Sequence, residues 1–160
     1  MKKIMLILIS VIMLFTACKE TSTEPNAYEE NFNGITFGMT KEEVIAIIGR
    51  APDYDYDPNI KYKNQIFFDV TTSYVSYHFD ENSKLYCIFA VYKSYDESEK
   101  EQMSIDLAHV KDELSEYYPE NTLTRIDETD NERFLFTESR VIQLKIYDDS
   151  FDVAIMNTDD

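Results

Sequence analysis

Two histidines and many carboxylates are the side chains in this sequence that could hold a metal ion or transfer protons. The histidines are His78 and His109, and the chain has 31 acidic residues. No spacing links the histidines to a metal site, and the HExxH, CxxC and GxSxG motifs are absent from the sequence. Among so many acids, carboxylate pairs at catalytic spacing arise by chance. We therefore expect structural or solvated histidines, no metal, no cofactor and no enzymatic activity.

Residues 53–59 form an acidic run that partly resembles a calcium-binding loop. Its aspartates alternate with Tyr54 and Tyr56. An EF-hand loop also needs glycine at its sixth position and glutamate at its twelfth, where this sequence has Pro58 and Asn64. We expect an exposed loop or sheet edge with outward acids. The alternatives are a calcium loop and a partner-binding surface, since tyrosine is favoured at interfaces.

The first residues have the pattern of a secretory signal. Lys2 and Lys3 give a positive start, and residues 4–15 carry no charge. This run of 12 residues is too short for a membrane-spanning helix, which needs about 20. The small residues Thr16 and Ala17 follow, as they do before a cleavage site.

Cys18 follows these small residues directly. Residues 14–18, Leu-Phe-Thr-Ala-Cys, resemble a lipobox, in which the cysteine becomes the first mature residue and carries diacylglycerol. The sequence thus predicts a bacterial lipoprotein with a signal peptide over residues 1–17 and a membrane anchor on Cys18. Two or more acyl chains make such an anchor stable. An ordinary secretory signal with an incidental cysteine is the alternative.

The mature chain would be strongly acidic. Losing residues 1–17 removes two lysines and no acid, which leaves 13 basic and 31 acidic residues and a net charge of −18. This charge repels nucleic acid and anionic headgroups and suits a basic partner or cations, although solubility alone would explain it. Cys87 would be the only remaining cysteine, so no internal disulfide can form. We expect it to be a buried, inert thiol.

A polar tether over residues 18–31 precedes the folded part, residues 32–160. The clearest local pattern in the folded part predicts a helix over residues 41–48. Thr40 and Glu43 can form a capping box, while Gly49 and Pro52 end the helix. Its buried face should comprise Val44, Ile47 and Ile48.

A second helix is predicted over residues 98–118. Its apolar stripe consists of Met103, Leu107, Val110, Leu114 and Tyr117. Strands are predicted over residues 62–70, 73–80, 85–92, 122–127, 133–137, 141–147 and 151–156. Residues 85–92 are apolar on both faces, which predicts a central strand covered on both sides.

The order of helix then strands occurs twice along the folded part. It predicts an α+β fold in which two helices pack on an antiparallel β-meander sheet. We expect one domain over residues 32–160, and a tandem repeat would divide it into halves 32–96 and 97–160.

Residues 34–52, from Gly-Ile-Thr-Phe-Gly-Met-Thr to Gly-Arg-Ala-Pro, resemble the opening of the SmpA/OmlA (BamE)-like lipoprotein family. Its best-known member is the small lipoprotein subunit of the outer-membrane β-barrel assembly machine. The β-lactamase-inhibitor-like domains use a similar helix-plus-meander unit, sometimes in tandem. The resemblance implies a lipid-anchored, non-enzymatic, protein-binding domain. Helix capping explains the Gly-Met-Thr motif, so the motif marks a fold and not a site.

Together these features predict a membrane-anchored, protein-binding module of the bacterial cell envelope. Its partners would be membrane lipid, through acylated Cys18, and an envelope protein, but not nucleic acid. The alternatives are an accessory subunit in outer-membrane β-barrel assembly and an inhibitor of a secreted hydrolase. Lys19, not aspartate, follows Cys18, which by resemblance favours the outer membrane or cell surface over the inner membrane.

Overall fold

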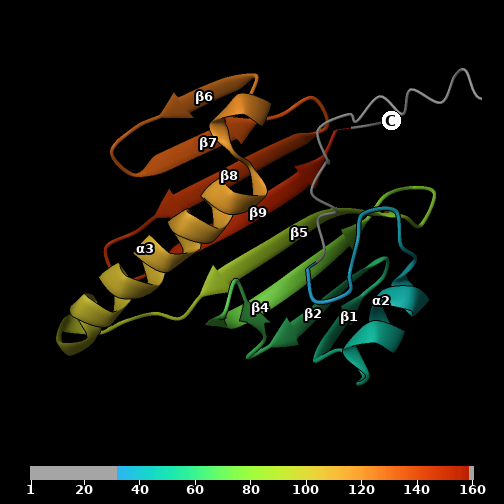
Figure 1. Cartoon of the computed structure of the whole chain (residues 1–160). Coiled ribbons are helices and arrows are strands. Elements are labelled where there is room, and N and C mark those ends of the chain that lie inside the picture. The colour runs from blue at the N-terminus through green and yellow to red at the C-terminus, as the bar shows by residue number, and fades with distance from the viewer. Residues whose placement is uncertain (1–31, 159–160) are drawn as a thin grey trace, which may run out of the picture.

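A computed structural model describes residues 32–158 (Figure 1). The predicted signal peptide, Cys18 and the tether lie outside the described residues. Within the described range the chain forms one nine-stranded sheet, two α-helices and two short 3-10 helices. The strands are β1 (Tyr54–Tyr56), β2 (Asn59–Lys63), β3 (Ile66–Phe67), β4 (Val70–Phe79), β5 (Leu85–Tyr92), β6 (Arg125–Glu128), β7 (Glu132–Phe136), β8 (Arg140–Ile146) and β9 (Phe151–Asn157). The helices are α2 (Lys41–Ile48), α3 (Lys100–Tyr117), η1 (Glu97–Glu99) and η2 (Glu120–Thr122).

The sheet consists of two antiparallel meanders joined at its centre. Its strand order is β1-β2-β4-β5-β9-β8-β7-β6, and the short β3 pairs with β4 off this path. The last strands of the two meanders, β5 and β9, pair from Cys87↔Met156 to Val91↔Asp152. Each meander follows one α-helix in the chain, as Figure 1 shows. The predicted α+β class with helices on an antiparallel meander sheet is confirmed.

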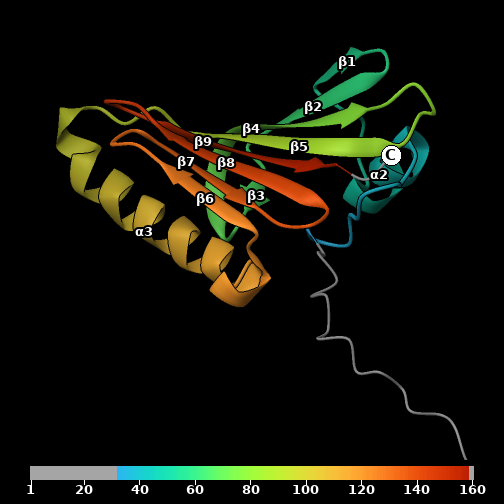
Figure 2. The same ribbon diagram turned by 90° about the horizontal axis from the view of Figure 1, so that it is seen from above.

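The helices and the inner face of the sheet share one hydrophobic core. Inward-facing residues alternate along each strand, and one row across the sheet is Ile60, Tyr77, Ile88, Ile155, Ile142 and Leu135. Helix α3 adds Val110 and Leu114 to the core, and α2 adds Val44. Figure 2 shows α3 lying along one side of the sheet. No described helix is long and apolar enough to cross a membrane.

Helix α2 has the predicted bounds and caps, but its buried face is rotated. Thr40 and Glu43 form the capping box, and Gly49 has a φ of 73°, the left-handed conformation that glycine adopts without strain. Val44 is fully buried, whereas Ile47 is 41% exposed, so the prediction of a buried Ile47 is wrong. The core-facing side instead runs from Val44 through Ile48 to Ile45.

Strand β5 is central, as predicted, but it is not covered on both sides. Ile88, Ala90 and Tyr92 are buried against the core, while Cys87 and Phe89 on the opposite face are only half-buried. The side chains of Cys87 and Phe89 face away from both α-helices.

The strand predicted over residues 62–70 is instead the end of β2, the short β3 and the start of β4. Phe68 and Asp69 have positive φ angles of 50° and 56° and turn the chain between β3 and β4. A hairpin turn without glycine has little sequence signal, and the prediction missed it.

Candidate functional site

The face of the sheet opposite the helices, here called the open face, is covered by no described helix (Figure 2). Cross-strand registers place on it Lys61, Tyr74, Ser76, Cys87, Phe89, Val91, Phe134, Phe136, Val141, Gln143, Lys145, Asp152, Ala154 and Met156. Apart from Ser76 and Ala154, which are buried, these side chains are half-exposed. The open face is therefore a broad, partly apolar surface formed by both meanders.

Basic side chains lie over aromatic rings on this face. The Lys61 Nζ atom is 3.8 Å from the centre of the Tyr74 ring, and the Arg125 guanidinium is 4.5 Å from that of Phe136. Tyr74 also approaches Phe89, with 6.4 Å between ring centroids. Such contacts hold large side chains in place without burying them. Aromatic residues, methionine and arginine are also the residue types enriched at protein interfaces.

Next to Phe89, the open face has a hollow of about 220 Å³. Its lining is Phe89, Gln143, Lys145, Tyr147, Asp152 and Ala154. One carboxylate oxygen of Asp152, Oδ1, is buried without a hydrogen-bond partner among the described residues. The other, Oδ2, accepts a hydrogen bond from the Tyr147 hydroxyl at 3.4 Å. Burial raises the pKa of Asp152, and the Tyr147 hydrogen bond and the Lys145 charge oppose this rise.

The acidic run at residues 53–59 forms an exposed sheet edge, as predicted, because β1 is the end strand of the sheet and all three of its residues are exposed. Its aspartates are engaged in protein contacts. Asp53 accepts hydrogen bonds from the Lys63 backbone N–H at 2.8 Å and from Arg50 at 2.9 Å, and these contacts lower its pKa. The Lys41 ammonium lies 2.6 Å from Asp55. These contacts favour ion pairing over calcium binding in this run.

His78 and Cys87 face each other on neighbouring strands of the open face. Burial, and to a lesser degree the charge of Lys61, lowers the pKa of His78, which keeps its imidazole neutral. Burial raises the pKa of the Cys87 thiol to about 11, so this thiol is unreactive at neutral pH. Cys87 is half-buried and not fully buried as predicted.

His109 belongs to a cluster that sequence reasoning missed. One ligand atom each of Asp69, His109 and Glu113 lies within 4.8 Å of the other two. His109 and Glu113 are one helical turn apart on α3, a spacing visible in the sequence. Asp69 lies at the tip of the β3–β4 hairpin, and only the fold brings it to α3.

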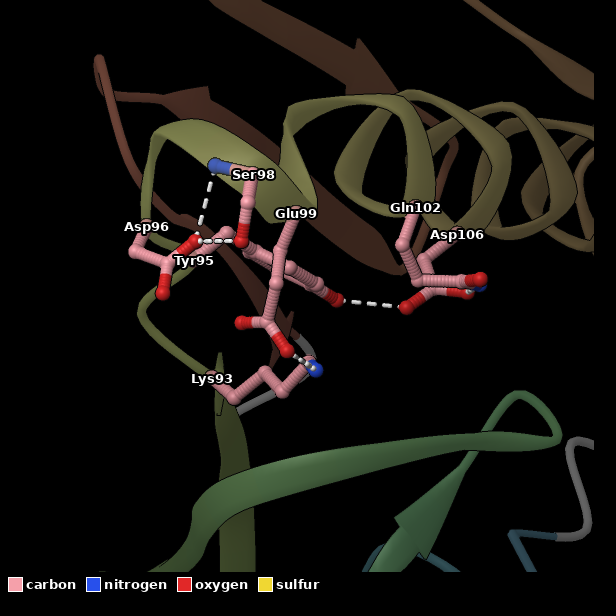
Figure 3. A network of polar contacts seen from close by, with 7 residues as sticks. All are labelled: Lys93, Tyr95, Asp96, Ser98, Glu99, Gln102 and Asp106. Atoms are coloured by element: carbon pink, nitrogen blue, oxygen red, sulfur yellow. Dashed lines mark hydrogen bonds and ion pairs between the residues drawn. The ribbon is translucent and has the colours of Figure 1, made fainter.

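A polar network fixes the start of α3 (Figure 3). The buried Tyr95 hydroxyl donates a hydrogen bond to Asp106 at 2.5 Å, and Gln102 donates to the other oxygen of Asp106 at 2.7 Å. Asp96 accepts a hydrogen bond from the Ser98 backbone N–H at 2.8 Å. These contacts join the β5–α3 connection to the helix, and we assign them a structural role.

A scan against protein-family models found no matching family, and searches among curated proteins and solved structures found no significant match. The similarity of residues 34–52 to the SmpA/OmlA family therefore stays a prediction.

Proposed function

We propose that the mature protein is a lipid-anchored, non-enzymatic protein-binding module of the bacterial cell envelope, and that its open face is the binding surface. The open face is the observation that carries this proposal. It combines half-exposed Phe89, Phe134 and Phe136 with positioned basic groups. Large aromatic anchors in a partly apolar patch supply most of the binding energy at protein interfaces.

The charge distribution also supports a protein partner. The whole chain carries a net charge of −16, yet Lys61, Arg125 and Lys145 lie on the open face. The cross-strand registers place the acids Asp127, Glu132 and Asp152 beside them, so this face carries acidic and basic groups in similar numbers, unlike the chain as a whole. A binding surface of mixed charge accepts a protein more readily than a strongly acidic surface would.

Crosslinking at defined positions tests the binding surface. A photo-activatable side chain in place of Phe134 or Gln143 should give one discrete protein adduct in intact cells. The same group in place of Ile105, an exposed apolar residue on α3 with 56% exposure, is the matched control. An identical adduct from Ile105, or none from the open face, would refute the assignment of the surface.

Labelling with a radioactive or clickable lipid precursor tests the anchor separately. The wild-type chain should incorporate label, and the Cys18→Ala variant should not. Equal labelling of both chains would exclude lipid on Cys18 while leaving the open face untouched as a binding surface.

An inhibitor of a secreted hydrolase is the second candidate. The order of helix and meander, which occurs twice, favours it, since β-lactamase-inhibitor-like domains use such units in tandem. Purified protein would then lower the activity of a co-secreted hydrolase at a fixed stoichiometry, and Phe89→Glu would remove this effect. The role in β-barrel assembly rests on residues 34–52 alone, and recovery of barrel-assembly components with the tagged protein would support it.

A further inference from the structure

The cluster of Asp69, His109 and Glu113 is held in place by packing. His109 and Glu113 project from α3 in successive turns, and both are half-buried. Asp69 is exposed, but its neighbour Phe68 is 9% exposed, and the rings of Phe68 and Tyr117 lie 5.6 Å apart. This aromatic contact docks the hairpin tip on α3. The position of Asp69 relative to the helix is therefore set by the core.

Within residues 32–158, no hydrogen bond or ion pair engages the side chain of Asp69, His109 or Glu113. The pKa of the adjacent Tyr117 is raised, first by burial and then by the charges of Glu113, Asp69 and Glu116. The carboxylates of Glu113 and Asp69 thus both lie near this hydroxyl, and a cation between the two carboxylates would be stabilised.

From this geometry we propose that Asp69, His109 and Glu113 bind a divalent transition-metal ion of the zinc type. The imidazole nitrogen of His109 and one carboxylate oxygen from each acid supply three ligands. Water would complete the coordination from the side of a hollow of about 100 Å³, which Asp69 and Glu113 line and His109 does not. A three-ligand set of imidazole and carboxylate leaves one tetrahedral position open.

The ligand types select the kind of ion. Imidazole suits zinc, copper, iron and nickel, while magnesium and calcium prefer oxygen ligands alone. Bonds of about 2.0–2.2 Å require ligand atoms closer together than the 4.8 Å limit within which these three lie, so any pair near that limit must move closer. The exposed Asp69 side chain has the freedom to do so. The bound ion would tie the hairpin of the first meander to the helix that precedes the second.

Metal titration of the full-length chain in detergent, purified without a polyhistidine tag, tests this proposal. Cobalt(II) serves as the spectroscopic probe and zinc as its competitor. We expect one cobalt ion per chain, displaced by zinc but not by equimolar magnesium or calcium. Zinc should also raise the thermal midpoint of unfolding, because it binds the folded state.

Matched variants distinguish specific metal binding at these three residues from the non-specific attraction of cations to an acidic protein. His109→Ala and Asp69→Asn should weaken zinc binding by more than the roughly tenfold that loss of an outer-shell partner costs. Glu101→Gln removes a charge from an exposed position in the first turn of the same helix and should leave binding unchanged. Asp69→Asn lies at an exposed turn, so it remains informative if His109→Ala does not fold. Binding that survives both ligand variants, that falls equally in Glu101→Gln, or that calcium displaces equally well would overturn the proposal.

Discussion

Asp152 is a carboxylate that the fold leaves poorly solvated. Its Oδ1 atom is buried without a partner among the described residues, and its pKa is raised from a model-peptide value of 3.8. A raised acid pKa means that the folded chain binds the proton more tightly than the unfolded chain. The ionised form therefore destabilises the folded state above the raised pKa, and this cost disappears as the pH falls below about 3.8.

Asp152→Asn should consequently raise the thermal midpoint of unfolding at pH 7, with a gain that shrinks on acidification toward pH about 4. Differential scanning calorimetry across this range measures the effect. Asp130→Asn is the control, since Asp130 is exposed, and it should change the midpoint little at either pH. A lower midpoint for Asp152→Asn at pH 7 would show that its contacts with Tyr147 and Lys145 outweigh the burial of its charge.

Tyr95 makes the other residue-scale contact with a measurable contribution. Its hydroxyl is buried and donates to Asp106, so Tyr95→Phe should lower the free energy of unfolding by about 1–2 kcal/mol. Urea denaturation followed by far-UV circular dichroism measures this change. Tyr86→Phe removes a hydroxyl from a side chain that is 41% exposed and should have no effect. Equal stability of all three proteins would mean that the network in Figure 3 contributes nothing to the fold.

Helix α2 shows how caps and burial contribute separately to one element. Thr40→Ala removes the hydroxyl of the capping box and should cost about 1 kcal/mol. Val44→Ala should cost about 2 kcal/mol because Val44 is fully buried. Ile47→Ala should cost less than Val44→Ala, since Ile47 keeps 41% of its surface exposed. Urea denaturation measures the loss of unfolding free energy in each variant. A larger loss for Ile47→Ala than for Val44→Ala would show that Ile47, and not Val44, faces the core.

The same helix shows what the sequence could predict. Capping boxes and terminal glycines are local chemistry, so residues 41–48 were predicted with the observed bounds. The choice between Ile45 and Ile47 depends on the angle at which the helix meets the sheet, which is tertiary information. Likewise the apolar pattern of β5 predicts a central strand. Whether a helix packs on its second face depends on where the helices lie, which the pattern does not encode. The His109 cluster needs Asp69, which is distant in sequence, and only its His109–Glu113 spacing was available beforehand.

At the scale of the whole molecule, the pairing of β5 with β9 joins the two meanders into one sheet. Inner-face residues of the two strands, such as Ile88 and Ile155, are fully buried and oppose each other. A chain that ends at Ser150 lacks β9 and leaves both β5 and β8 with an unpaired edge. We expect the complete protein to unfold cooperatively, as single domains of this size do, and this truncated chain to lose that transition. Tyrosine fluorescence and circular dichroism during urea denaturation would detect the loss, and a retained sharp transition would mean that the first meander folds alone.

The central place of β9 also affects what the sheet exposes while the chain folds. Among the described strands β9 is the last in chain order, yet it lies in the middle of the sheet between β5 and β8. Until residues 151–157 are in place, β5 and β8 each present an unpaired apolar edge. Such edges pair readily with other chains, so the protein is most prone to aggregate before β9 docks.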